Sequence, residues 1–281
     1  MSLLSLMPTS VTTASEFNDQ VLRINVNEEA ISKLDARIKK LEDAAIPSPT
    51  PTPNPNLYDD FKYTETFQVG KPSNNGKWLL QYTSSGSAKA DGNGSVLVPG
   101  GTELSIYSGS VLLRSTKKYT NSRVTFYLTN EKQVYTKDKN GNTITPPGWH
   151  APWPFIRHVD KYQHWYAIIG RDKVEMGKKD APRTITDQAT IEHYQFTIWT
   201  GGPPTPVGMK RKVTMECIGN KFSLYLDDVL IKTLVDDGNL IGNSSFYSNM
   251  KLKQSDWTTG EFCEYVEGCQ GRFEMVSIET L

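Results

Sequence analysis

The sequence predicts a mostly β protein, an antiparallel β-sandwich preceded by one N-terminal helix. From residue 57 onward, short segments that alternate apolar and polar residues are separated by clusters of Gly, Asn, Pro and Ser, as in strands with one buried face. No segment of helical length and periodicity interrupts that series. Residues 14–46, in contrast, carry a seven-residue apolar repeat. We therefore expect a docking peptide over 1–13, a coiled-coil helix over 14–46, a spacer over 47–56 and a β domain over 57–281.

The first element is the expected helix. Thr13 lies three residues before Glu16, which is the spacing of a capping box. Its a and d positions are Phe17, Gln20, Ile24, Asn27, Ile31, Leu34, Ile38 and Leu41. A helix this short is marginal alone in water, so it needs partners, and oppositely charged g and e' positions favour a parallel oligomer. The alternative is an amphipathic helix that packs on its own domain.

Two sequence patterns give conflicting indications of the number of helices in this oligomer. Ile at a with Leu at d is typical of two-stranded coiled coils. The stretch "RINVNEEAI", with Asn27 at a d position, resembles the I-x-x-N-x-x-x-I layers of trimeric fibre and adhesin stalks. We expect a trimer, with a dimer as the alternative.

The segments on either side of the helix are interpreted as an attachment and a spacer. Residues 1–13 have a short apolar core and no basic region, so they make a poor secretory signal. They are expected to dock into a larger assembly, the alternative being a frayed terminus. The tract "PSPTPTPNPN" at 47–56 predicts a semi-rigid polyproline II spacer of roughly 30 Å.

The expected strands of the β domain follow one another at short intervals. They are "KWLLQYT", "SVLLRST", "RVTFYLT", "HWYAIIG", "QFTIWT", "RKVTMECI", "KFSLYLD", "VLIKTLV" and "RFEMVSIE". Gly219-Asn220 and Asp227-Asp228 are expected as two-residue hairpin turns. "DGNGSV" and "DKNGNT" are also expected to be turns, because they lack the sixth-position glycine and closing glutamate of a calcium loop.

Composition excludes several classes of function. Lys+Arg and Asp+Glu both total 31, so no net charge argues for nucleic acid. No apolar run approaches the ~20 residues of a membrane span. The spacing of the His and Cys residues predicts neither a metal site nor a cofactor. Cys263 and Cys269, placed in one loop, can close a small disulfide ring, whereas Cys217 is expected as a buried thiol.

Two stretches carry a family resemblance. "HWYAIIGRDKVEMGKKD" and, further on, "RKVTMECIGNKFSLYLDDVLIKTLVDD" resemble the concanavalin A-like lectin/glucanase jelly-roll superfamily, which includes laminin G-like domains. The similarity spans residues 59–281. It implies a jelly roll of two curved antiparallel sheets, with sugar bound, in many members, on the concave face or at the loop rim.

The candidate ligand-binding residues lie near "TPPGWHAPWPFIRH". Rigid tryptophans stack on sugars or anchor another protein, so we expect at least one of Trp149 and Trp153 to be exposed. The alternative is that both indoles complete the core. The remaining candidates are Arg157, His158, Tyr162 and Trp199.

No catalytic residue is assigned. The E-x-D-x-x-E motif of the glucanase branch is absent, and Glu175 and Glu192 are isolated acids. The window from Arg157 to Lys173 contains the base and cation types that a lyase uses, but a solvent-facing strand has the same composition.

These patterns together predict an oligomeric fibre protein of a virion or phage, at the virion or cell exterior, whose heads bind glycan on a host surface. The alternatives are a virion-associated polysaccharide lyase or glycoside hydrolase, and a capsid decoration protein without glycan binding. The fibre attribution rests on architecture alone.

Overall fold

The computed structural model describes residues 56–84, 86–99, 109–133, 136–137 and 142–281, which fall within one compact unit, Asn54–Leu281. The expected docking peptide, the coiled-coil positions and the spacer up to residue 55 lie outside the described residues. So does the expected turn at 138–141.

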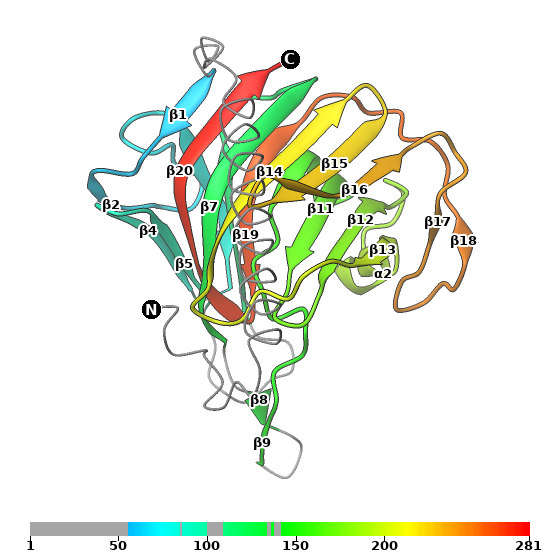
Figure 1. The fold of residues 1–281 in the computed structure, drawn as a ribbon, viewed down its shortest axis with the longest axis horizontal. Helices are drawn as coiled ribbons and strands as arrows, with labels where there is room; N and C mark the ends of the chain where they lie inside the picture. Colours follow the sequence, from blue (N-terminus) through cyan, green and yellow to red (C-terminus); the bar gives the residue numbers. More distant parts are fainter. Residues whose placement is uncertain (1–55, 85, 100–108, 134–135, 138–141) are drawn as a thin grey trace, which may run out of the picture. The chain divides into compact units, whose positions relative to one another are not determined.

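Two antiparallel sheets form the described part of the chain (Figure 1). The first has the order β16-β15-β14-β7-β20-β5-β4-β2, with β1 paired to β20. Its nine strands are β1 (Leu57–Asp59), β2 (Thr64–Thr66), β4 (Ser87–Asp91), β5 (Ser95–Val98), β7 (Ser122–Gln133), β14 (Lys210–Ile218), β15 (Lys221–Leu226), β16 (Val229–Val235) and β20 (Cys269–Thr280).

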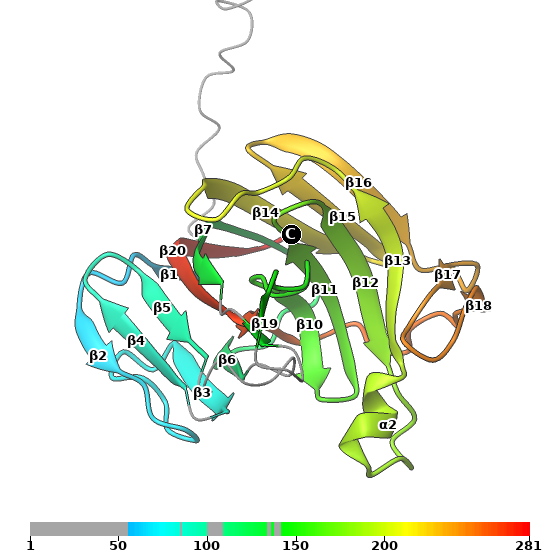
Figure 2. The same cartoon turned by 90° about the horizontal axis from the view of Figure 1, so that it is seen from below.

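The second sheet has the order β13-β12-β11-β10-β19-β6-β3. Its seven strands are β3 (Trp78–Thr83), β6 (Ser110–Ser115), β10 (Phe155–Asp160), β11 (Gln163–Ile169), β12 (Val174–Asp180), β13 (Gln195–Gly201) and β19 (Glu261–Glu267). The smaller elements are the pair β8 (Thr136–Lys137) and β9 (Thr143–Ile144), the pair β17 (Ile241–Gly242) and β18 (Met250–Lys251), and the helix α2 (Gln188–Glu192). Figure 2 shows α2 and the β17–β18 pair beside the β13 edge of this sheet.

The predicted antiparallel sandwich is confirmed, and each expected strand is present. The turn at Gly219-Asn220 joins β14 to β15. The turn at Asp227-Asp228 joins β15 to β16, with φ of 51° and 66° at its two residues. Many of the expected strands alternate because one face of each meets the core, whereas β11 is buried along its whole length.

Two segments differ from expectation. The stretch around "VEMGKK", which is not among the expected strands, forms β12, and the stretch around "FCEYVEG", expected as a loop, forms β19. Both strands lie inside the seven-stranded sheet and are largely buried on both faces, so their sequences do not alternate. The sequence also gave no sign of α2, a short helix whose N-cap Asp187 accepts a bond from the Thr190 amide.

The expected disulfide ring is a second correction. Cys263 and Cys269 are both free and buried. Cys263 lies on β19 in the seven-stranded sheet, and Cys269 begins β20 in the nine-stranded sheet, because the chain crosses between sheets at Gly268. The two thiols belong to separate apolar clusters, so no ring closes. Cys217 is a buried free thiol, as predicted.

The main core fills the space between the sheets. Phe126 of β7 and Phe262 of β19 meet across it with ring centroids 5.3 Å apart. Trp78 is fully buried in the same core and stacks on Phe61 at 5.5 Å. Aromatic side chains of this size dominate the apolar area that folding removes from water.

A second apolar cluster covers the outer face of the seven-stranded sheet. Strand β11 is buried along its whole length. Trp165 belongs to the main core, while Tyr166 and Ile168 belong to the second cluster. Because neighbouring side chains of a strand point to opposite faces, the second cluster lies on the side away from the nine-stranded sheet.

Candidate functional site

A broad groove lies over the outer face of the seven-stranded sheet. Its volume is about 1320 Å³, and each of the seven strands contributes to its lining, together with α2 and the segments before β10 and after β17. An open groove of this size suits an extended ligand of several units better than one small molecule.

The floor of the groove is a layer of aromatic rings. Phe155 stacks on Tyr265 at 5.0 Å and on His164 at 4.3 Å between ring centroids. Trp153 stacks on Tyr166 at 5.6 Å and meets Tyr265 edge-on at 5.9 Å. All five side chains are less than 10% exposed, so they form a rigid base more than a free contact surface.

Gly177 on β12 makes room for this layer. A Cβ at that position would lie 2.5 Å from the Tyr166 hydroxyl and 2.0 Å from the Phe196 carbonyl oxygen. Neither the backbone carbonyl nor the packed ring can move away cheaply. Gly177 therefore allows a close approach of neighbouring groups within a strand.

Exposed aromatic side chains stand over this floor. Trp149 is 50% exposed and Tyr82 is 39% exposed, while Trp199 is partly buried. All three line the groove. The prediction that at least one of Trp149 and Trp153 is exposed is confirmed, because Trp153 alone is buried.

A cluster of charged side chains lies near α2. The ammonium of Lys179 pairs with Glu192 at 2.7 Å, and the hydroxyl of Tyr265 donates to Glu267 at 3.0 Å. Burial raises the pKa of Glu267 to about 7, a shift that Glu192 reinforces and that Tyr265 and Lys179 oppose. One carboxyl group in the groove is thus protonated close to neutral pH while its neighbour is ion-paired.

Polar groups continue along β12 and β13. Glu175 accepts a bond of 3.2 Å from the Thr197 hydroxyl and pairs with Lys173 at 3.1 Å. Gln195 and Asn243 line the same part of the groove. Amide, hydroxyl and carboxylate groups are therefore distributed along its length.

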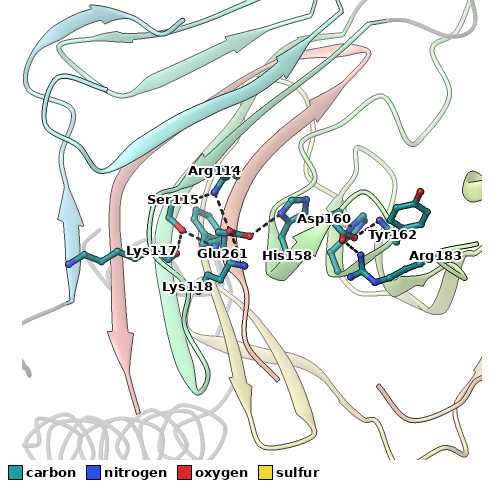
Figure 3. Close-up of polar contacts among 11 residues, drawn as sticks. Arg114, Ser115, Lys117, Lys118, His158, Asp160, Tyr162, Arg183 and Glu261 are labelled. Carbon is teal, nitrogen blue, oxygen red and sulfur yellow. Dashed lines mark hydrogen bonds and ion pairs between the residues drawn. The ribbon is translucent and has the colours of Figure 1, made fainter. Parts of the chain in front are cut away.

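His158 and Glu261 form the polar contact at the β10–β19 pair (Figure 3). Nδ1 of His158 lies 3.4 Å from Oε2 of Glu261, and Arg114 contacts the other carboxylate oxygen at 3.1 Å. Burial acts to raise the pKa of Glu261, but His158, Arg114 and Lys118 outweigh it, so that pKa lies below its ordinary value. Glu261 is therefore a fixed anion that orients the His158 ring.

His164 stacks beside His158 with ring centroids 5.6 Å apart. Burial lowers its pKa well below the ordinary value, and His158 and Lys179 lower it further. The neutral imidazole of His164 therefore contributes to the packing of the groove floor.

The structure brings four of the six predicted ligand-binding residues together. Trp149, Trp153, His158 and Trp199 all line the groove, whereas Arg157 and Tyr162 do not. Tyr162 follows β10 in the turn to β11, where Lys161 and Arg183 lie over its ring at 5.1 and 5.7 Å. Figure 3 shows it beside Asp160 and Arg183, apart from the His158–Glu261 pair.

Arg157 is placed on the opposite side of its strand. Register irregularities interrupt the alternation of β10 here, so that Phe155 and His158, three residues apart, both line the groove and Arg157 does not. Its φ is 52°, at a register irregularity of β10, and its guanidinium donates to the carbonyl oxygens of Thr120 and Gly219 at 3.1 and 2.7 Å. Of these two candidate ligand-binding residues, His158 therefore lines the groove and Arg157 does not.

Several groove residues were not found from the sequence. Tyr82, Lys179, Glu192 and Glu267 come from four elements that are distant along the chain. No local pattern marks these residues, because β19, for example, is buried on both faces and its sequence does not alternate.

Neither a metal site nor a spanning helix emerges within the described ranges. No group of three or more His, Cys, Asp or Glu side chains there is placed to hold a metal ion. No helix of that part of the chain is long and apolar enough to cross a membrane.

Comparisons with known proteins found similar solved structures but no match to a family model or to a curated protein. Among solved structures, it is similar to the carbohydrate-binding module CBM66 from Bacillus subtilis, with 16% identity, a TM-score of 0.48, and coverage of 76% of this chain and 99% of that one. The chain is also similar to the β-glucanase of Bacillus licheniformis, with 10% identity, a TM-score of 0.45, and coverage of 80% of this chain and 98% of that one. For the laminarinase from Rhodothermus marinus, the identity is 10%, the TM-score is 0.46, and the coverage is 80% of this chain and 96% of that one.

Proposed function

We propose that the β domain binds glycan in the groove over its seven-stranded sheet. The observation that carries this proposal is the combination of exposed rings, Trp149 and Tyr82, with a row of hydrogen-bonding side chains in one open groove. Sugars present apolar C–H faces, which pack on aromatic rings, and hydroxyl groups, which need hydrogen-bond partners. The groove offers both kinds of contact.

A glycan array with the intact chain tests this proposal, followed by calorimetric titration of the best oligosaccharide. Binding should be lost or weakened in Trp149→Ala and unchanged in Tyr58→Ala. Tyr58 is a matched control because it is 43% exposed on β1 of the other sheet. An array without hits would favour the alternative of a decoration protein whose head binds no sugar.

The groove would act from an oligomeric stalk. The heptad pattern of 14–46 and the spacer at 47–56 support a parallel trimer, with a dimer as the alternative, that carries several heads. Linking weak heads raises avidity by roughly 10² to 10⁴ without a new contact. This arrangement suits a fibre at a virion or cell exterior, attached through residues 1–13 to a larger assembly.

A second candidate is a polysaccharide lyase or glycoside hydrolase. It is favoured by Glu267, whose pKa of about 7 suits a general acid, beside the ion-paired carboxylate of Glu192. Incubation with glucan and uronate polysaccharides, monitored for reducing ends and unsaturated products, separates it from simple binding. Turnover that disappears in Glu267→Gln while binding is retained would establish the enzyme.

A further inference from the structure

A second cavity lies at one end of the sandwich, between the two sheets. Its volume is about 160 Å³, and it shares no lining residue with the groove. Strands β10, β11, β14 and β15 form its walls, and residues 254–258, before β19, close it. A water molecule takes about 30 Å³ in the liquid, so this cavity has room for a group of several heavy atoms.

A buried cation without a counter-ion faces this cavity. Arg157 is 4% exposed, and its partners are the carbonyl oxygens of Thr120 and Gly219 and the amide oxygen of Asn121 at 3.4 Å. All three partners are neutral, and no ion pair to Arg157 forms within the described part of the chain. Three bonds leave two of its five N–H groups unused. A buried charge in this position is costly unless an anion accompanies it.

Trp257 also lines this cavity, and its indole carries a donor without a partner. The indole Nε1 of Trp257 is buried and has no hydrogen-bond partner in the structure, and the residue as a whole is 8% exposed. A buried N–H group that lacks an acceptor costs free energy, so an acceptor from outside the chain would be stabilising here.

The carboxylate of Asp236 also lines the cavity, but other groups occupy it. It pairs with Lys178 at 3.1 Å and accepts from the Ser255 amide at 2.9 Å. Lys178 is completely buried between the rings of Trp165 and Trp257, with its ammonium 5.5 and 5.7 Å from their centroids. Asp236 is therefore engaged by Lys178 and Ser255, and no ion pair between Asp236 and Arg157 forms.

We propose that this cavity binds a small carboxylate. A carboxylate supplies one negative charge and two acceptor oxygens, which match the remaining guanidinium donors and the Trp257 N–H. Trp165 and Phe222 give the walls an apolar character that suits a short carbon body. Two sources have this chemistry, a free aliphatic acid and the carboxylate of a single uronic acid.

The test uses the six indole N–H signals of the intact chain in a ¹H–¹⁵N correlation spectrum. Acetate should move the Trp257 signal saturably, and its neutral isostere acetamide should not. The signals of Trp78 and Trp153 are internal references, because their indoles already donate to Asp59 and to the Trp149 carbonyl. Absence of a saturable acetate shift, or an equal shift with acetamide, would overturn the proposal.

Variants identify the site. Arg157→Gln should weaken acetate binding at least tenfold, the loss of one charge-assisted contact. The control Arg211→Gln, at a partly buried arginine that pairs with Asp227 and does not line the cavity, should not change it. If Arg157→Gln does not fold, Trp257→Phe, which removes the N–H donor together with the five-membered ring of the indole, is followed through the Trp165 signal and by calorimetry. Undiminished acetate binding in folded Arg157→Gln, or in Trp257→Phe, contradicts the assignment.

The source of the carboxylate is read from two further titrations. Glucuronate binding tighter than acetate, with no effect of glucose, assigns the cavity to an acidic sugar. Acetate binding alone assigns it to a small free acid. Because the cavity and the groove share no lining residue, either result is independent of whether the groove binds neutral glycan.

Discussion

The indole Nε1 of Trp153 donates a 2.8 Å hydrogen bond to the main-chain carbonyl oxygen of Trp149. The buried ring of Trp153 is itself fixed by Tyr166 and Tyr265 in the groove floor. One tryptophan therefore holds the backbone that presents the other to solvent. This division of roles explains why two neighbouring indoles in one segment have such different exposure.

The exposed member of the pair should contribute mainly to binding. Trp149→Ala is expected to weaken the affinity for the best glycan of the array about tenfold, since a stacked aromatic anchor contributes about 1–2 kcal/mol. The unfolding midpoint in urea should stay the same, because half of the side chain is already in water. Calorimetric titration and urea unfolding check the two halves separately. Equal affinity in Trp149→Ala and in the control Tyr58→Ala would remove Trp149 from the binding surface.

The carboxyl group of Glu267 should make stability depend on pH. Its pKa is raised from 4.5 to about 7 in the folded protein, so the folded state holds a proton that the unfolded chain releases between those two values. Its contribution to stability is therefore complete below about pH 4.5 and declines as the pH rises to about 7.

Glu267→Gln removes this titration and leaves the other groups in place. As the pH rises from 4.5 to 7, the unfolding free energy of the wild type should fall relative to that of the variant. Above about pH 7 the difference between the two should stay constant. Urea unfolding at several pH values measures it. A difference that does not change with pH would show that the folded-state pKa of Glu267 is ordinary.

The carboxylate of Asp59 should be important for the stability of the β domain. It accepts hydrogen bonds from the Phe61 amide at 2.9 Å, the Tyr63 hydroxyl at 3.1 Å, the Asn75 amide at 2.9 Å and the Trp78 indole at 2.8 Å. Asp59→Ala leaves buried donors without an acceptor, and we expect a loss of at least about 3 kcal/mol in urea unfolding.

Asp60→Ala is the matched control for that experiment. Asp60 is the next residue, and its carboxylate accepts one exposed bond, from the Lys62 amide at 3.2 Å. The control should change the unfolding free energy by less than about 0.5 kcal/mol. A similar loss of unfolding free energy in both variants would mean that the hydrogen bonds to Asp59 contribute no more to stability than the one to Asp60.

The three cysteines should remain thiols without added reductant. Cys263 and Cys269 are buried in different apolar clusters, and burial raises the pKa of both well above the ordinary value. Thiol titration after unfolding in the absence of reductant should therefore find three thiols per chain, and reductant should not change the melting temperature. Finding a single thiol together with a mass lower by two hydrogen atoms would indicate that the ring forms.

The stalk can be tested separately from the head. Sedimentation of the intact chain should give an oligomer, whereas a chain that lacks residues 1–46 should give a folded monomer, because the heptad positions lie within that segment. A monomeric intact chain would contradict the coiled-coil proposal and leave the groove proposal unaffected.

The sequence by itself determined the antiparallel sandwich, most of its strands, two of its hairpin turns and the exposure of an indole before β10. Strands such as β7 and β14 have one face in the core and one toward solvent, so their side chains alternate and the pattern is visible in one dimension. Turn residues such as Gly219-Asn220 are equally local, because the backbone conformation of two residues selects them.

Only the tertiary structure decided which side chains share a surface. β11 and β19 are buried on both faces, so their sequences carry no alternation that would separate core from groove. Hydrogen-bonded pairing brings Tyr82, Trp149, Glu192 and Glu267 to one groove from distant parts of the chain. At β10, a register irregularity breaks the regular alternation, so that Phe155 and His158 both reach the groove while Arg157 lines a separate cavity.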